Sequence, residues 1–231
     1  MNSLIVTAAE SAAFRNGSKT AFVVPVKGGM DARATEIVPS TQWKGYDFVA
    51  RFKYPRTDQD VYEVTNLYKS PYQIGQKIYL REPWRKYYYV DPNGYTQFDK
   101  QIIELISENT EPINEYDADG WQVFNKDGSE RMIPTRSAAN MPRSAARTWI
   151  TPVGCEVVRC RDVTKAQMVD HAIHSHDTIH GNILWLNHAD GCTWFENVAD
   201  SWQSYIAAKL CKSFWDANGW LFFYTSKLDE K

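Results

Sequence analysis

Hydrophobic and polar residues alternate with a period of two at the end of the segment 70–84, which is the most informative stretch of the chain. Ile78 and Leu80 alternate with polar or amphipathic neighbours, a pattern that predicts a strand with one buried face. Pro71 and Gly75 mark a turn before it. A cation, a carboxylate and an indole follow within four residues, on Arg81, Glu82 and Trp84. The segment therefore predicts a strand that delivers polar groups to one end, where a ligand can be oriented.

Similar patterns predict the other elements of a mixed α+β fold. Thr7 with Glu10 and Thr164 with Gln167 form capping boxes, which predict helix starts. Gly17 supplies the left-handed stop of the first helix. We expect helices at about 8–16, 164–173 and 201–215, strands at 3–6, 21–26, 47–54, 60–67, 76–81, 156–161 and 220–228, and a loop at 27–45.

The segment at about 85–137 differs from the rest and is interpreted as a β-rich insertion into a single domain spanning 1–231. Asp91-Pro-Asn-Gly94 and Lys126-Asp-Gly128 are typical hairpin turns. Residues 102–108 fit either a strand or a short helix. The middle of the insertion is acidic, for which a solvated face is the default explanation.

Composition narrows the class of protein. The chain has 231 residues, 43% of them hydrophobic and 14% aromatic, enough for a core with aromatic groups left for stacking surfaces. The net charge of −2 gives no global basic field, so nucleic acid would need a local cationic surface. The four cysteines show no CxxC spacing, and we find no secretory signal or membrane-length apolar run. We expect reduced thiols and a cytoplasmic location, the host cytosol if the gene is viral, with no membrane partner.

Several cations are candidate ligand-binding groups. Lys19 follows the first helix and either is a solvated cation or binds a phosphate. Arg81, Arg143 and Arg147 can cradle phosphates or stack on bases, or can instead pair with Glu82, Glu156 or a carboxylate of the insertion. Trp84 fits the core better than a stacking platform.

Four histidines lie close together in the sequence and raise a metal hypothesis. They are His171, His174, His176 and His180. Three imidazoles can bind Zn²⁺ or another transition metal. No HExxH or cysteine-pair framing accompanies them, so polar surface is the simpler interpretation, and we predict no metal and no cofactor.

The order of these motifs resembles that of ASCH domains in the PUA-like superfamily, and especially an ASCH-like family common in bacteriophage genomes. Four blocks carry the resemblance: Asn16-Gly-Ser-Lys-Thr20; Pro71-Tyr72 with Gly75 and Leu80-Arg-Glu-Pro-Trp84; Met141-Pro-Arg143 with Asp162-Val-Thr164; and the C-terminal helix with Asp216-Ala-Asn218 and the last strand. They cover most of the core but not the insertion.

The resemblance implies a small mixed β-barrel with flanking helices and a cleft for RNA, single-stranded nucleic acid or a modified nucleotide. Some ASCH proteins hydrolyse N4-acetylcytidine with a lysine, a threonine and a glutamate. Lys19 matches the lysine, but Phe22 and His171 stand at the threonine and glutamate positions, and Val24 replaces an arginine. Thr20 cannot substitute, because it would point to the other face of a strand. Lys19 and His171 remain catalytic candidates.

These observations leave three hypotheses of different classes. The first is a non-catalytic module that binds nucleic acid or a modified nucleotide through Lys19, Thr20, Arg81, Glu82, Trp84, Arg143 and Arg147. The second is an enzyme, either a diverged amidohydrolase that uses Lys19 and Glu82 or a metal-dependent ribonuclease that uses the histidines. The third is a phage protein that binds a host protein through the 85–137 insertion.

Overall fold

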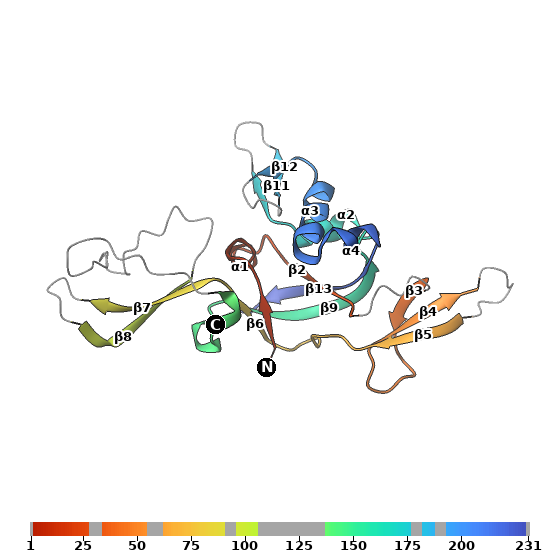
Figure 1. Ribbon diagram of the computed structural model, residues 1–231, viewed down its shortest axis with the longest axis horizontal. Coiled ribbons are helices and arrows are strands. Elements are labelled where there is room, and N and C mark those ends of the chain that lie inside the picture. Colours follow the sequence, from red (N-terminus) through yellow and green to blue (C-terminus); the bar gives the residue numbers. More distant parts are fainter. Residues whose placement is uncertain are drawn as a thin grey trace. The chain divides into compact units, whose positions relative to one another are not determined.

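A computed structural model describes residues 2–27, 34–54, 62–90, 96–105, 137–176, 182–187 and 193–229. The described elements form a mixed α+β fold (Figure 1). The helices are α1 (Ala8–Arg15), α2 (Lys165–His171), α3 (Val198–Leu210) and α4 (Lys212–Asp216), with the 3-10 turns η1 (Ala138–Asn140) and η2 (Arg143–Ala145). The strands are β1 (Ser3–Ile5), β2 (Ala21–Pro25), β3 (Glu36–Pro39), β4 (Phe48–Lys53), β5 (Tyr62–Tyr68), β6 (Ile78–Arg81), β7 (Trp84–Val90), β8 (Thr96–Leu105), β9 (Trp149–Arg159), β10 (His174–His176), β11 (Ile183–Leu186), β12 (Trp194–Phe195) and β13 (Trp220–Leu228).

The chain divides into two compact units, each built from separate stretches of sequence. Unit 1 comprises Met1–Gly17, Lys77–Ile150 and Leu228–Lys231. Unit 2 comprises Ser18–Gln76 and Thr151–Lys227. The predicted 85–137 insertion falls within unit 1.

In unit 1, β6 is the middle strand of three. It pairs in parallel with β1, which aligns Ser3 with Tyr79, and antiparallel with the start of β9, which aligns Tyr79 with Trp149. Ile78 and Leu80 are completely buried, whereas Tyr79 and Arg81 are only partly buried. The predicted half-buried strand is therefore confirmed. The capping box of Thr7 and Glu10 is also formed at the start of α1.

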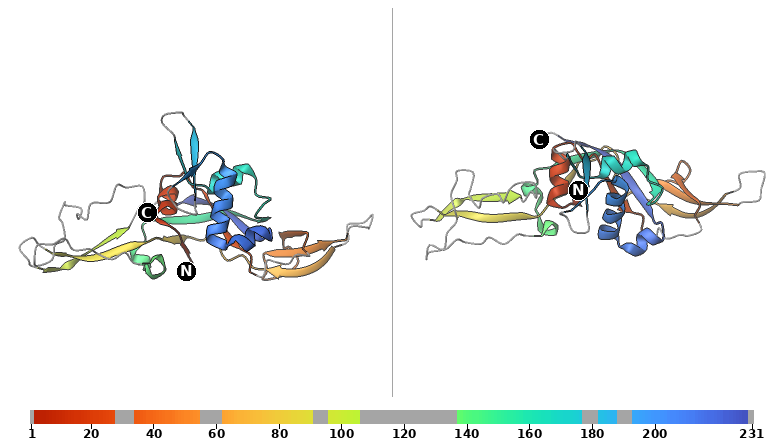
Figure 2. Two further views of the ribbon diagram at one scale, coloured as in Figure 1. Left: turned by 45° about the horizontal axis from the view of Figure 1, so that its top comes forward. Right: turned by 90° about the horizontal axis from the view of Figure 1, so that it is seen from above.

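In unit 2, the rest of β9 continues the sheet, whose full strand order is β1-β6-β9-β13-β2. Within unit 2, helix α3 lies against β13 (Figure 2). Trp202, Tyr205 and Ile206 of α3 lie in one cluster with Leu221 and Phe223 of β13. Burying these large side chains, at about 25 cal/mol per Å² of apolar surface, supplies much of the stabilisation of this unit.

Three expectations about elements need correction. The predicted loop at 27–45 contains β3, which pairs with β4. The single helix expected over 201–215 begins at Val198 and breaks at Cys211 into α3 and α4. Cys211 has a φ of 85°, a left-handed backbone that no L-residue adopts within a helix. In addition, the strand expected at 156–161 is the last part of a longer strand, β9, which begins at Trp149 and ends at Arg159.

The fold class is confirmed as α+β, but the described strands form no closed barrel. They form an open five-stranded sheet, two three-stranded sheets and one two-stranded sheet. The two-stranded sheet pairs β7 with β8 antiparallel, which confirms the first hairpin of the insertion and shows that 102–105 is strand. The turn residues 91–94 and the second hairpin at 126–128 lie outside the described residues.

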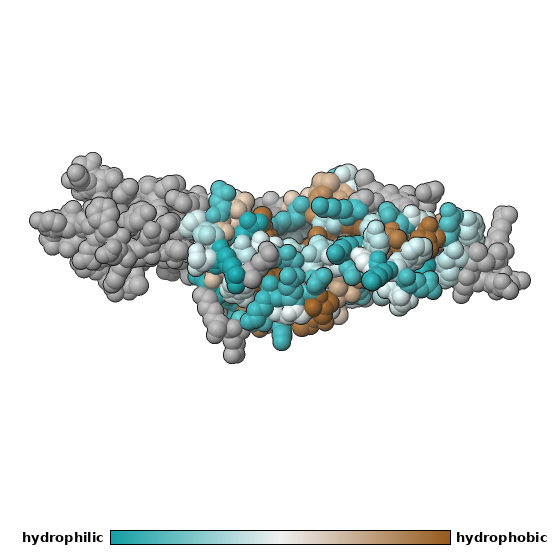
Figure 3. All heavy atoms as spheres, turned by 90° about the horizontal axis from the view of Figure 1, so that it is seen from below, coloured by the Kyte–Doolittle hydropathy of each residue, from teal (hydrophilic) through white to brown (hydrophobic). Residues whose placement is uncertain are grey.

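The displayed face in Figure 3 carries interspersed hydrophilic and hydrophobic residues. Among the described residues no helix is both long enough and apolar enough to span a membrane.

Candidate functional site

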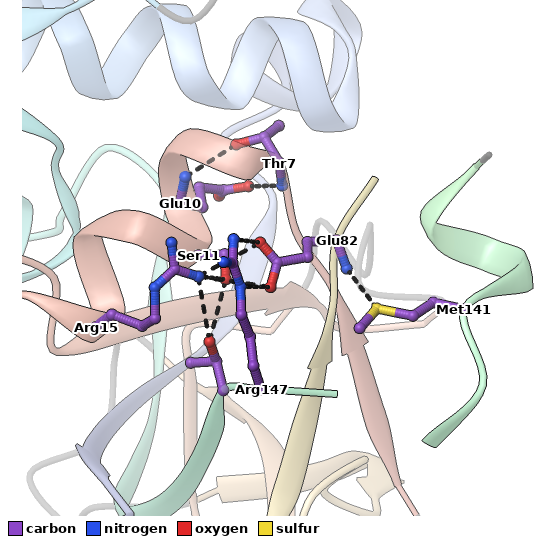
Figure 4. A network of polar contacts seen from close by, with 8 residues as sticks. Thr7, Glu10, Ser11, Arg15, Glu82, Met141 and Arg147 are labelled. Carbon is purple, nitrogen blue, oxygen red and sulfur yellow. Dashed lines mark hydrogen bonds and ion pairs between the residues drawn. The ribbon is translucent and has the colours of Figure 1, made fainter. Parts of the chain in front are cut away.

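The carboxylate of Glu82 lies at the end of β6 and joins two arginines from other elements (Figure 4). Arg147, just before β9, makes a bidentate contact: Nε to Oε1 at 3.2 Å and Nη2 to Oε2 at 3.3 Å. Arg15, the last residue of α1, reaches the same carboxylate with Nη1 at 3.4 and 3.5 Å. We call these three residues the Arg15–Glu82–Arg147 cluster. Of the roles predicted for Arg147, the structure shows the ion pair with Glu82.

Burial and charge are unevenly distributed in this cluster. Glu82 has no exposed side-chain surface, whereas the side chains of Arg15 and Arg147 are 28% and 34% exposed. Burial lowers the pKa of Arg15, and repulsion by Arg147 lowers it further, while Glu82 opposes both effects. Two guanidinium groups therefore share one buried carboxylate. Arg15 was missed by the sequence reasoning, since its only signal was a basic residue in the last turn of a helix.

Aromatic and cationic side chains gather around the start of β9. The Arg143 guanidinium lies 5.2 Å from the centre of the Trp149 ring, and that ring lies 5.5 Å from Tyr79 on the neighbouring strand. Arg81 shares the outer side of β6 with Tyr79 and donates from Nη1 to the Ala139 carbonyl at 2.8 Å. We call Tyr79, Arg81, Arg143 and Trp149 the Trp149 surface.

A small apolar cluster supports the Trp149 surface from beneath. Trp84 is 3% exposed and packs with Met141, Ala145 and Ala146, and Tyr79 and Trp149 lie at its margin. The expectation that Trp84 belongs to the core is confirmed. Arg143 and Arg147 do not share a face, because η2 ends at Ala145 and the two guanidiniums have different partners, Trp149 and Glu82.

Lys19 lies in the interior of unit 2. Its side chain is 2% exposed, its Nζ donates to the His171 carbonyl, and it lies 5.7 Å from the centre of the Tyr205 ring. The interpretation of Lys19 as a solvated cation is therefore wrong. Thr20 is exposed and so faces away from Lys19, as expected.

His171, the second catalytic candidate, is also buried in unit 2. It is 1% exposed and makes edge-on contacts with Trp202 and Tyr205, with ring centres 5.0 and 4.2 Å apart. The hydrogen bond from Lys19 Nζ to its carbonyl places the two catalytic candidates side by side. Aromatic rings on two sides leave little polar surface around the imidazole for proton transfer to a substrate.

Phe22, which the resemblance to ASCH domains predicts at the position of a catalytic threonine, is buried in unit 2. Its ring stacks on Tyr224 with a centre distance of 4.8 Å and meets Tyr72 edge-on at 5.6 Å. Burial raises the pKa of the Tyr224 hydroxyl, which bonds to Ser70. Phe22 is therefore part of an aromatic cluster, and its side chain supplies no hydroxyl that could take the place of a catalytic threonine.

The histidine cluster is only partly described. His174 and His176 lie on β10, while His180 and the side chain of His176 are outside the described residues. Where the structure is described, no three histidine, cysteine, aspartate or glutamate residues are grouped so that they could hold a metal ion.

The sequence reasoning also missed a pocket on the β3-β4-β5 sheet of unit 2. It has a volume of about 190 Å³ and is lined partly by Trp43, Arg51 and Tyr62. Arg51 and Lys53 lie 5.5 and 5.8 Å from the centre of the Tyr62 ring. The strand register, which pairs Lys53 with Tyr62, brings these groups together, and no sequence motif signals it.

This chain matches no protein-family model, no curated protein and no solved structure. The resemblance to ASCH domains stays a prediction.

Proposed function

We propose that unit 1 binds single-stranded nucleic acid, RNA or DNA, on the Trp149 surface. The observation that carries the proposal is the grouping of a guanidinium with two rings: Arg143 lies 5.2 Å from the centre of the Trp149 ring, and the Tyr79 ring lies 5.5 Å from Trp149 at a tilt of 45°. Proteins that bind single strands combine aromatic rings, on which bases stack, with cations that follow the backbone. The Trp149 surface offers both classes of group.

Exposure makes these groups available to a ligand. Arg143 is exposed, and Tyr79, Arg81 and Trp149 are partly exposed. The only carboxylate that the strand itself contributes nearby in sequence, Glu82, is buried and neutralised by two arginines. Arg81 and Arg143 thus place two cations on this surface even though the whole chain has a net charge of −2.

The chemistry favours single strands over duplexes. Bases in a duplex are already stacked on one another, whereas unpaired bases expose faces to an indole or a phenol. Each base stacked on an aromatic ring contributes about 1–3 kcal/mol. Two rings with two arginines are consistent with weak, sequence-tolerant binding of a short segment.

Fluorescence anisotropy with labelled single-stranded RNA, single-stranded DNA and the matching duplexes tests this function. We expect both single strands to bind more tightly than the duplex, with an affinity that falls as salt rises. Equal affinity for duplex and single strand, or binding that is independent of salt, would rule the proposal out.

A further inference from the structure

We infer that Arg15 and Arg147 form a binding site for a phosphate group, with Glu82 as the buried carboxylate that positions both guanidiniums. The site goes beyond the proposed function, because none of its residues belongs to the Trp149 surface and its ligand need not be a nucleic acid. Three observations carry it: two guanidiniums against one carboxylate, the Arg15 donors that remain, and the partial exposure of both arginines.

The first observation is the charge of the Arg15–Glu82–Arg147 cluster. Glu82 is fully buried and already receives a bidentate contact from Arg147, so it balances one guanidinium. Two guanidiniums thus lie against one carboxylate, and repulsion between the two arginines contributes to the lowered pKa of Arg15. An added anion relieves that repulsion.

The second observation concerns the donors of Arg15. Within the described residues its hydrogen bonds all come from Nη1, to Ser11 Oγ at 3.0 Å, to both oxygens of Glu82 and to Thr148 Oγ1 at 3.4 Å. In Figure 4 every dashed contact of Arg15 starts from that one nitrogen. Its Nε and Nη2 can therefore donate hydrogen bonds to the oxygens of a ligand.

The third observation concerns burial: the residues that hold Arg15 in place are buried, whereas the two arginines are partly exposed. Ser11, Thr148 and Glu82 are each no more than 1% exposed, while the two arginines are 28% and 34% exposed. The Arg15 guanidinium, held by these partners, is preorganised. Its Nε and Nη2 donors match the oxygens of a phosphate.

The test uses inorganic phosphate as the probe and the full chain. Phosphate is titrated at constant ionic strength by calorimetry into the wild type, Arg15→Gln and Lys212→Gln. Lys212 is exposed on α4 of unit 2, so its variant makes the same charge change elsewhere. We expect saturable binding by the wild type and Lys212→Gln, and a loss of about tenfold or more in affinity in Arg15→Gln, since two charge-assisted contacts disappear.

Arg15→Gln should fold, because Arg147 still neutralises Glu82. A second measurement needs no substitution: modification of the wild type by phenylglyoxal, mapped by mass spectrometry. Phosphate should protect Arg15 and Arg147 but not Arg161, an exposed arginine of unit 2 that belongs to neither proposed site. Absence of saturable binding, or equal modification of Arg15 with and without phosphate, would overturn the inference.

Two further probes distinguish the source of the phosphate. A 5′-phosphorylated dinucleotide that protects Arg15 as well as inorganic phosphate does, while a 5′-hydroxyl dinucleotide does not, indicates a terminal or free phosphate. Protection by both dinucleotides indicates a backbone phosphate, which also supports the site. Because inorganic phosphate contains no base, its binding is unaffected if the Trp149 surface fails to bind nucleic acid.

Discussion

Arg147 holds the carboxylate of Glu82 in a bidentate ion pair, with N–O distances of 3.2 and 3.3 Å, and no part of that carboxylate reaches solvent. A buried carboxylate is costly unless it is paired and hydrogen-bonded. The pair therefore fixes the loop before β9 to the end of β6, directly beside the aromatic residues of the Trp149 surface. Packing of unit 1 depends on this charge balance.

Glu82→Gln should lower the free energy of unfolding by about 3 kcal/mol, the lower end of the effect of breaking a buried pair. The reason is that two neighbouring guanidiniums lose their common counter-charge. Urea denaturation followed by circular dichroism measures it. The matched control is Glu63→Gln at an exposed position on β5, for which a change within about 0.5 kcal/mol is expected. Equal effects of the two substitutions would show that the ion pair does not stabilise the fold.

Lys19→Met should destabilise the protein by about 1–3 kcal/mol, because it removes a buried hydrogen-bond donor to the His171 carbonyl while keeping the length of the side chain. Lys212→Met, at an exposed position, is the control and should change stability little. The thermal midpoint of each variant checks this. A Lys19 variant as stable as the wild type, with weaker nucleic-acid binding, would instead make Lys19 a ligand contact.

The wild type should not hydrolyse N4-acetylcytidine. Phe22 is stacked on Tyr224 and offers no hydroxyl, and His171 lies between aromatic rings. His171→Glu alone should also be inactive, and it should unfold at lower urea than His171→Gln because it buries a charge. Chromatography of the nucleoside after incubation measures turnover, with heat-denatured protein as control. Hydrolysis by the wild type that the control lacks would reverse the assignment of these positions.

Alkaline pH should destabilise unit 2. Burial raises the pKa of the Cys155 thiol from 9.0 to about 11 and also raises the pKa of Tyr224. A raised pKa in the folded state stabilises it below the unfolded pKa, and this contribution disappears as pH rises through the folded pKa. Urea midpoints should therefore fall between pH 9 and about 11. Cys155→Ala should reduce the slope, and an unchanged slope would exclude the thiol as its source.

The same pKa differences predict which of the three described thiols, Cys155, Cys160 and Cys211, reacts first. A hydrogen bond from Ser213 lowers the pKa of the exposed Cys211, whereas Cys155 and Cys160 have raised pKa values caused by burial. Because the thiolate is the nucleophile, iodoacetamide at pH 8 should label Cys211 well before the other two. Peptide mass spectrometry reads the order. Labelling of Cys155 at the rate of Cys211 would contradict the described burial.

Local rules recovered much of the fold from the sequence. The two capping boxes, the half-buried β6 and the final strand β13 were predicted because each depends on residues close in sequence. The break at Cys211 was not, since nothing local signals a left-handed cysteine. The short strand β3 was not predicted, because glycines and prolines in the segment 27–45 indicate a loop. It forms through pairing with β4, which lies outside that segment.

Site residues were harder to predict because their roles depend on contacts distant in sequence. Arg15 and Glu82 are 67 positions apart and meet only in the folded unit. The pocket beside Tyr62 likewise depends on strand register. Lys19 illustrates the opposite error: a lysine after a helix usually remains solvated, but here tertiary packing buries it.

The most direct test of the central claim is the affinity for a labelled single-stranded RNA of the wild type, Arg143→Gln, Trp149→Leu and Tyr62→Leu. Tyr62 is a matched control, since it too is an aromatic ring beside cations but belongs to the pocket in unit 2. We predict a loss of about fivefold to a hundredfold for Trp149→Leu, from the value of one stacked base. Arg143→Gln should weaken binding and lower the salt slope by about 0.7. Circular dichroism must show that each variant is folded. Wild-type affinity in both Trp149→Leu and Arg143→Gln, or a loss confined to Tyr62→Leu, would contradict the account.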